Sequence, residues 1–392
     1  MMQQSNIDNF INEVSALTDF DSKKFNTKYI DFIQISTDEK QIIDYLEDSL
    51  RLYYSIADSP QTGTKYHVCF LIKDIDEEVK NNIEMNGSII EHYSPSAHEK
   101  FKKIKLDYRE NKFYMFCNNQ VIVMERNNKV TMVISRLTKN TLKETKRLIR
   151  EQMLYGEREN NNEVPLHSGA IVVDNIGMLV MGNKGSGKTS TILAMLNSGA
   201  NFVSNDLVFF KKCNNDYYAM GTPESIRIGI GTLKQYSILG ELVPQKYKKY
   251  DKKSKELWNI PKDEKEEIEW YDLEKYFPTR VEYNYVEVKI ILFPNISKNT
   301  EHKITKIPSI QMMEYLNDNN LSVYSKQSPG LWLDCIKEDH RKITKSSDSL
   351  LDSASKGLFG YEIFFDGTEE VLRDSVRKIV RLYKEENYEV HK

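Results

Sequence analysis

The chain has 392 residues, with 55 Lys and Arg against 58 Asp and Glu, which gives a formal net charge of −3 at pH 7. A chain of this length is expected to form at least two domains. The charge lacks the basic excess that marks general nucleic-acid binding, so we expect no nucleic-acid partner.

The cysteines and the N-terminal residues indicate the compartment. The four cysteines lie far apart and form no Cys-x-x-Cys pair, which argues against a zinc module, a redox dithiol or a disulfide scaffold. We expect reduced, mostly buried thiols at Cys69, Cys117, Cys213 and Cys335. The first residues, MMQQSNIDNFINEV, are polar and acidic where a signal peptide is basic and then apolar, and no apolar run approaches the length of a membrane span. The sequence predicts a cytoplasmic protein without a membrane partner.

The first part of the chain combines helix-type and strand-type patterns. Apolar spacing predicts helices over residues 5–17 and 38–53. Asn127-Asn128 is expected to be the turn of a hairpin. Strands are predicted at 66–72, 112–117, 120–126 and 129–136. We therefore expect residues 1–155 to form a smaller domain of helices and an antiparallel sheet.

A polar stretch marks the predicted domain boundary. A helix is expected over residues 140–155, and GERENNNEV at 156–164 follows it with the composition of an exposed connection. Beyond this stretch the pattern changes to strand, turn, helix and strand, which is α/β in character. We place a second, larger domain at 156–392.

Strand-like runs alternate with helical and charged stretches in this second domain. Strands are predicted at 170–173, 178–181, 202–203, 207–210, 285–293 and 360–365. Asp174-Asn175 is expected to be a hairpin turn, and an amphipathic helix is expected after a turn at Asp366-Gly367. Residues 246–274 are dense in Lys and Glu, so we expect a solvated helical or loop excursion, with a basic docking surface as the alternative.

One motif carries specific chemistry. GNKGSGKT at residues 182–189 fits G-x-x-x-x-G-K-[ST] at every fixed position, between an apolar strand and an expected helix. The glycines let backbone N–H groups converge on phosphate oxygens, and the helix N-terminus adds partial positive charge. The sequence therefore predicts a site for ATP or another nucleoside triphosphate. Its expected residues are Gly182, Asn183, Lys184, Gly185, Ser186, Gly187, Lys188, Thr189 and Ser190.

Two side chains of the loop and one downstream acid are candidates for the phosphate and the metal. Lys188 should reach the β- and γ-phosphates, and Thr189 should ligate Mg²⁺. A second acidic group is needed for the metal or the nucleophile, and NFVSNDLVFF supplies Asp206, 17 residues past Thr189 between two apolar runs. A purely structural aspartate in a turn at Asn205-Asp206 is the alternative.

The sequence resembles a known family around this motif. The stretch LHSGAIVVDNIGMLVMGNKGSGKTSTILAMLNSGANFVSNDLVFF looks like the catalytic domain of HPr kinase/phosphorylase and related proteins. The similarity covers about residues 164–210, and 224–240 resembles a later segment only faintly. It implies an α/β domain of the HPr-kinase and PEP-carboxykinase type after an unrelated N-terminal domain, α+β overall, and a possible homo-oligomer.

The resemblance also implies roles for individual residues. Lys188 and Thr189 would hold nucleotide and Mg²⁺, and Asp206 matches the family's second acidic position. His167 would lie near the reacting phosphates, and Arg227 matches the family's arginine. By itself, His167 could equally be a structural residue, and Arg227 a surface ion-pair partner.

One position departs from the family pattern. Asn205 stands where HPr kinase has its first Asp, and an amide cannot accept a proton at neutral pH. Three alternatives follow: Asp206 takes both roles, or Glu224 or His167 serves as the base, or the protein binds nucleotide without transferring it.

Two functions remain open. The first is an ATP- and Mg²⁺-dependent kinase with Asp206, His167 and Lys188 as catalytic residues, acting on a hydroxyl, most simply Ser or Thr of a peptide or protein substrate. The second is a nucleotide-gated binding or regulatory protein with little or no phosphotransfer. ATP, GTP and pyrophosphate all fit the loop as phosphate sources.

Overall fold

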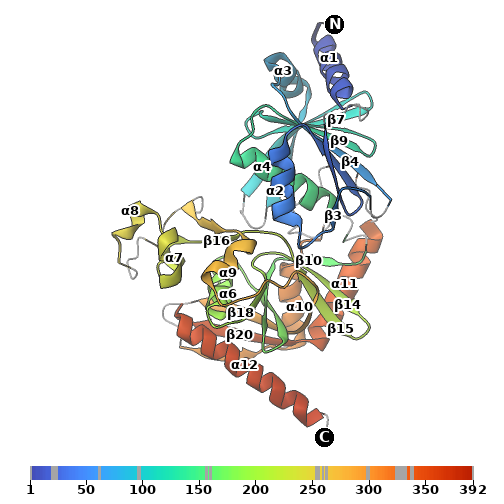
Figure 1. The fold of residues 1–392 in the computed structure, drawn as a ribbon. Helices are drawn as coiled ribbons and strands as arrows, with labels where there is room; N and C mark the ends of the chain where they lie inside the picture. The colour runs from blue at the N-terminus through green and yellow to red at the C-terminus, as the bar shows by residue number, and fades with distance from the viewer. Residues whose placement is uncertain are drawn as a thin grey trace. The chain divides into compact units, whose positions relative to one another are not determined.

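Two compact units make up the chain. The computed structural model describes residues 2–18, 25–60, 63–94, 99–154, 158, 161–251, 257, 260, 264–296, 301–322, 333–335 and 340–390. Unit 1 comprises Met1–Asn160 with Ser328–Asp339, and unit 2 comprises Asn161–Gln327 with His340–Lys392 (Figure 1). The separability of two domains divided at 155/156 stays a prediction.

A nine-stranded mixed sheet forms the centre of unit 1, in the order β3-β1-β2-β4-β9-β8-β7-β6-β5. The strands are β1 (Asn26–Ile30), β2 (Ile33–Thr37), β3 (Ile56–Ala57), β4 (Tyr66–Ile72), β5 (Ser88–Ser94), β6 (Glu99–Tyr108), β7 (Asn111–Phe116), β8 (Val121–Arg126) and β9 (Lys129–Ile134). The hairpin at Asn127-Asn128 is confirmed, since Arg126 pairs with Lys129. The expectation of an antiparallel sheet is wrong at the centre, because β4 runs parallel to both β2 and β9.

Helices cover this sheet. They are α1 (Met2–Leu17), α2 (Lys40–Leu50), α3 (Glu77–Asn86) and α4 (Lys139–Arg147), which continues as a π-helix, η1 (Leu148–Leu154). Apolar side chains of α1 and α3, such as Phe10 and Ile83, form one core with Phe113 and Met115 of β7. The helix predicted over residues 38–53 is shorter than expected, because Leu52 lies beyond the end of α2 and is 43% exposed.

The larger sheet of unit 2 is also mixed, in the order β10-β14-β15-β18-β12-β11-β13. The strands of unit 2 are β10 (Val164–Leu166), β11 (Ser168–Val173), β12 (Ile176–Met181), β13 (Asn201–Ser204), β14 (Val208–Cys213), β15 (Asp216–Gly221), β16 (Ile226–Ile228), β17 (Glu266–Ile268), β18 (Val286–Ile296), β19 (Lys303–Lys306) and β20 (Phe359–Phe365). Strand β18 runs parallel to β12 and β20, and β19 pairs with β20, while β16 and β17 form a separate two-stranded sheet. The hairpin at Asp174-Asn175 is confirmed by the pairing of Val173 with Ile176.

Helices pack on both faces of this sheet (Figure 1). The helices of unit 2 are α6 (Lys188–Leu196), α7 (Ile230–Leu233), α8 (Gln245–Lys248), α9 (Leu273–Tyr276), α10 (Ser309–Asp318), α11 (His340–Gly357) and α12 (Glu369–Val390), with 3₁₀ turns at Ser237–Leu242 and Trp270–Asp272. Of these, α7 and α8 lie to the side of the sheet (Figure 1). Helices α10 and α11 share a core with Ala170 and Leu179. Helix α6, which contacts α12, lies on the opposite face, where a Cβ at Gly169 would come within 2.2 Å of Ile192 Cδ1.

Two expectations from the sequence are wrong. The stretch 246–274 is not a solvated excursion throughout, because β17 pairs with β16 and Trp270 is 1% exposed. The alternating charges concealed this short strand and the buried aromatic ring. The cysteines are free but not mostly buried, since Cys69 alone is buried and Cys213 is exposed. Among the helices of the described residues, none is both long and apolar enough to cross a membrane.

Candidate nucleotide-binding site

The glycine-rich loop connects β12 to α6 in a conformation that requires glycine. Gly182, Gly185 and Gly187 have φ angles of 139°, 82° and 107°, a region that L side chains rarely adopt. A Cβ at Gly182 would lie 2.8 Å from Ser186 Oγ, and one at Gly187 would lie 2.7 Å from Phe365 Cζ. A Cβ at Gly185 would meet nothing within 4 Å. The loop is therefore packed at both ends and open at Gly185.

Lys188 folds back over this loop. It is the first residue of α6, and its ammonium donates a hydrogen bond of 2.7 Å to the carbonyl oxygen of Gly182. The side chain is buried, and burial lowers the pKa of its ammonium, while the negative charge of Asp206 opposes that shift. The cation is thus held at the loop, close enough to Asp206 for their charges to interact.

The remaining loop residues divide between the exposed tip and the base. Asn183 and Lys184 are exposed at the tip, and Thr189 and Ser190 are partly buried in the first turn of α6. The backbone N–H of Ser186 donates to the Asn183 carbonyl over 3.1 Å, and its carbonyl accepts from the Ile296 N–H over 3.0 Å. The first bond closes a turn within the loop, and the second attaches the loop to the end of β18.

His167 and Asp206 come together although 39 residues separate them. His167 lies between β10 and β11, where its backbone N–H donates to the Asn319 carbonyl over 2.8 Å. Its Nε2 lies 3.0 Å from Oδ1 of Asp206, which occupies the turn from β13 to β14. This pair links the two sequence-predicted residues directly.

The charges around Asp206 favour its ionised form. Burial of this carboxyl works to raise its pKa, but the hydrogen bond and charge of His167 and the positive charges of Lys188 and Lys265 outweigh burial. The net result is a pKa below the ordinary range for aspartate. Asp206 is therefore a carboxylate at neutral pH, which suits a ligand of a divalent cation.

Two buried side-chain oxygen atoms have unused hydrogen-bonding capacity, one in the loop and one in the residue before Asp206. Among the described residues, Oγ of Ser186 and Oδ1 of Asn205 have no hydrogen-bond partner. Buried polar atoms are seldom left in this state unless a ligand, ion or water contacts them. With the glycine conformations and the ammonium of Lys188, the Ser186 hydroxyl fits a bound triphosphate, because it can donate to a phosphate oxygen. Oδ1 of Asn205 only accepts, so it suits a hydroxyl, a water or a cation, and Thr189 and Asp206 are the residues that would hold Mg²⁺.

Sequence reasoning missed Lys265. It immediately precedes β17, and its charge lowers the pKa of both Lys188 and Asp206. The pairing of β17 with β16 fixes the chain next to this lysine. In the sequence it is one of many lysines in a charged stretch, so only the β16–β17 pairing could have singled it out.

Arg227 and Glu224 each contact a neighbouring residue. Arg227 lies in β16 with its side chain 44% exposed, and its Nε is 3.5 Å from Glu267 Oε1 on the paired strand. This is the surface ion pair that the sequence analysis gave as the alternative to a phosphate clamp. The backbone N–H of Glu224 donates to the Thr222 carbonyl over 2.7 Å. Across the described part of the chain, no group of three or more His, Cys, Asp or Glu side chains could form a metal cage.

Comparisons with known proteins give a distant structural resemblance. No protein-family model matches the chain, and no curated protein matches it. The chain is similar to the solved structure of the Hpr(Ser) kinase/phosphatase from Coxiella burnetii, with a TM-score of 0.26 and 15% sequence identity. The match covers 56% of this chain and 98% of that one.

Proposed function

We propose that this protein is an ATP- and Mg²⁺-dependent kinase that transfers the γ-phosphate to a hydroxyl of Ser or Thr in a peptide or protein. The observation that carries the proposal is the glycine loop between β12 and α6, with Lys188 bound to Gly182 and in electrostatic reach of Asp206. The resemblance of residues 164–210 to HPr-kinase-related proteins supports the same activity.

The loop supplies the binding energy for the triphosphate. Backbone N–H groups at the start of α6 point toward an anion at its N-terminus, where the helix dipole adds positive charge. Lys188 exchanges the Gly182 carbonyl for a phosphate oxygen, a stronger partner because it carries full charge. Mg²⁺ held by Thr189 and Asp206 would supply further neutralisation of the phosphate charge.

The His167–Asp206 pair positions the acceptor. His167 fixes the carboxylate over 3.0 Å and keeps it ionised. A carboxylate with a lowered pKa is a weak base, but phosphoryl transfer passes through a loose transition state that requires mainly positioning and charge neutralisation. Asp206 therefore orients the acceptor hydroxyl and receives its proton as the new bond forms.

Asn205 favours a second candidate function. Its amide is buried, with Oδ1 lacking a partner, at the position where HPr kinase has a carboxylate. An amide can orient a group but cannot take its proton. A nucleotide-gated binding or regulatory protein that transfers phosphate slowly or not at all would tolerate this amide.

Phosphate release and transfer to peptides, measured for wild type and two variants, separate these functions. Asp206→Asn is expected to lower transfer by about 10²-fold or more, with a much smaller loss of nucleotide affinity. Asp216→Asn is the matched control, because Asp216 is 46% exposed on β15 and pairs with Lys289. Asn205→Asp should raise transfer if the amide limits proton removal.

Each outcome of this experiment is decisive. Equal transfer by Asp206→Asn and a clearly active wild type would refute the catalytic assignment of Asp206. An inactive wild type with an active Asn205→Asp variant would favour the nucleotide-gated binder.

A further inference from the structure

Four polar side chains gather on one face of the unit 1 sheet. Lys105 of β6 pairs with Tyr114 of β7, and Lys112 of β7 pairs with Glu125 of β8. Cross-strand partners point to the same face, and residues two apart on a strand share that face. Lys105, Lys112, Tyr114 and Glu125, called the polar face below, therefore lie opposite the core formed with α1 and α3.

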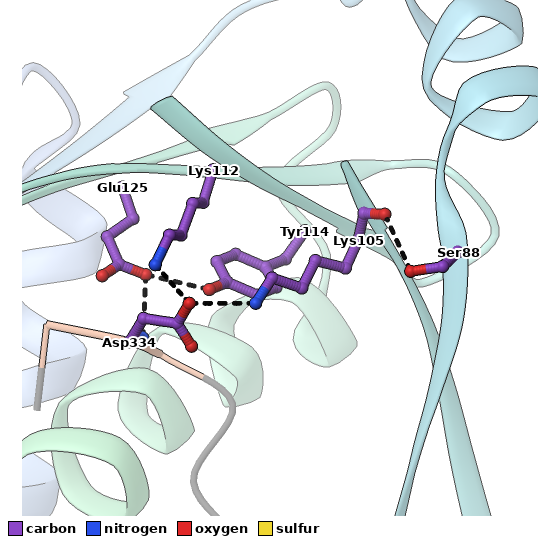
Figure 2. A network of polar contacts seen from close by, with 6 residues as sticks. All are labelled: Ser88, Lys105, Lys112, Tyr114, Glu125 and Asp334. Atoms are coloured by element: carbon purple, nitrogen blue, oxygen red, sulfur yellow. Dashed lines mark hydrogen bonds and ion pairs between the residues drawn. The ribbon is translucent and has the colours of Figure 1, made fainter. Parts of the chain in front are cut away.

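A short segment from elsewhere in the chain lies against the polar face. Figure 2 shows Lys105 and Lys112 directed at the carboxylate of Asp334, and Glu125 directed at its backbone nitrogen. The Asp334 N–H donates to Glu125 Oε2 over 3.0 Å, and the Tyr114 hydroxyl donates to the same oxygen over 2.9 Å. Lys105 Nζ lies 2.9 Å from Asp334 Oδ2, and Lys112 donates to that oxygen as well.

The segment is recognised through both its side chains and its backbone. Leu333 is 2% exposed, so an apolar residue is buried immediately before the aspartate. The Asp334 carboxylate lies between two ammonium groups, and its backbone N–H meets a buried carboxylate. The carboxylate and backbone N–H of Asp334 therefore pair with both ammonium groups and the carboxylate of the polar face, next to a buried leucine.

Simple packing does not account for the polar face. Glu125 is 4% exposed and Tyr114 is fully buried, and burial raises the pKa of Glu125 although the Asp334 N–H and Tyr114 oppose the shift. Burying a carboxylate costs several kcal/mol before its partners offset that cost. Apolar residues would pack a neighbouring segment at least as stably, whereas a buried acid that accepts a backbone N–H discriminates among partners.

The origin of the segment in the sequence matters here. Residues 333–335 belong to unit 1, yet they come between α10 and α11, which both belong to unit 2. The segment is therefore separated in sequence from the rest of unit 1, to which it is bound.

We propose that the polar face is a peptide-binding surface, and that residues 333–335 occupy it as an internal ligand. The partner is an acidic peptide segment in which an apolar residue precedes Asp or Glu. A tethered ligand has an effective concentration of roughly millimolar, so a free peptide binds weakly until the tethered one is weakened. This inference goes beyond the proposed kinase activity and stands without it.

A direct binding measurement on the full chain tests the proposal. The probe is a fluorescently labelled peptide with the sequence of residues 328–339, SPGLWLDCIKED, and the measurement is fluorescence anisotropy without nucleotide. Asp334→Asn in the protein removes charge-assisted bonds from the internal ligand and should raise the affinity for the peptide by at least about tenfold. Adding Lys105→Gln and Lys112→Gln should abolish that gain. Lys102→Gln, on the same strand but 65% exposed, is the matched control and should leave it unchanged.

A second measurement covers the case in which Asp334→Asn fails to fold. Cys335 adjoins the segment, and burial raises the pKa of its thiol to about 12, so it should alkylate slowly in the wild type. The double variant Lys105→Gln with Lys112→Gln, in a chain that keeps Asp334, should release the segment and speed alkylation of Cys335 by about tenfold. The rate of alkylation is measured by peptide mapping. Peptide affinity unchanged by Asp334→Asn, gained affinity that survives the lysine changes, or an unaltered alkylation rate would each overturn the proposal.

Discussion

Replacing Gly187 with alanine tests the conformation of the phosphate-binding loop. Gly187 has a φ of 107°, and a Cβ there would lie 2.7 Å from the ring of Phe365. An L residue at such an angle costs about 1–3 kcal/mol, and forcing a methyl group into a packed site costs a further 1–3 kcal/mol or so. We expect Gly187→Ala to lower the free energy of unfolding by about 2–6 kcal/mol.

Substitutions at two other glycines separate the cost of backbone strain from the cost of a steric clash. Gly185 has a φ of 82°, and an added methyl group would meet nothing within 4 Å, so Gly185→Ala should cost only the backbone strain, about 1–3 kcal/mol. Gly240, in the 3₁₀ turn at Ser237–Leu242, has neither feature, so Gly240→Ala should change stability by less than about 1 kcal/mol. Gly185→Ala should nevertheless weaken nucleotide binding at least about tenfold, because its methyl group enters the open part of the loop.

Urea denaturation followed by circular dichroism measures the stability series, and calorimetric titration with Mg²⁺ and ATP measures binding. A loss of about 3 kcal/mol corresponds to a midpoint lower by roughly 1 M for a slope of about 3 kcal/mol per M. Equal midpoints for Gly187→Ala and Gly240→Ala would refute the loop conformation. Undiminished nucleotide affinity in Gly185→Ala would refute its use as a phosphate cradle.

The remaining predictions concern charged groups of unit 2. Arg227→Ala should change the free energy of unfolding by less than about 1 kcal/mol in urea denaturation and leave nucleotide affinity unchanged, because its pair with Glu267 is exposed. The folded-state pKa of Asp206 lies below its ordinary value, so its stabilising contribution is present above about pH 4 and is lost as the pH falls through the folded pKa. The difference in unfolding free energy between wild type and Asp206→Asn should therefore shrink below that pH in acid titrations. His167→Gln should raise the pKa of Asp206, seen by NMR titration of its carboxyl carbon, and an unchanged value would show that the imidazole does not set it.

Local sequence signals predicted much of the fold. The turns at 127–128 and 174–175 join strands that are adjacent in sequence, so an asparagine-rich turn between apolar runs was sufficient to identify each hairpin. The strand at 66–72 was predicted with its observed bounds, because both faces of β4 carry apolar residues. Its parallel neighbours were not predicted, since no local signal reports pairing between distant strands.

Other elements lacked a distinctive pattern. Strand β6 reads EKFKKIKLDY, and its alternating lysines resemble a solvated stretch although Leu106 reaches the core. Strand β17 was concealed in the same way. In both cases one face of the strand is polar, so the strand can be recognised only from its pairing with neighbouring strands.

In the candidate site too, local features could be predicted from the sequence and contacts between distant residues could not. The loop is contiguous, so its motif could be identified from the sequence alone, and the resemblance to a known family directed attention to His167 and Asp206. Lys265 could not be found, because its charge acts on Lys188 only in the folded chain, where β17 next to it pairs with β16. The roles of these residues in binding and transfer stay predictions.

Calorimetric titration with Mg²⁺ and ATP tests the central claim most directly. Wild type should bind one nucleotide per chain, and Lys188→Ala should retain its circular dichroism spectrum while losing at least about tenfold in affinity, because it lacks the ammonium that pairs with the β- and γ-phosphates. Lys275→Ala, a change of a lysine 70% exposed on α9, is the control and should bind as wild type does. Equal affinity of wild type and Lys188→Ala would contradict the claim that the loop at 182–189 is the nucleotide site.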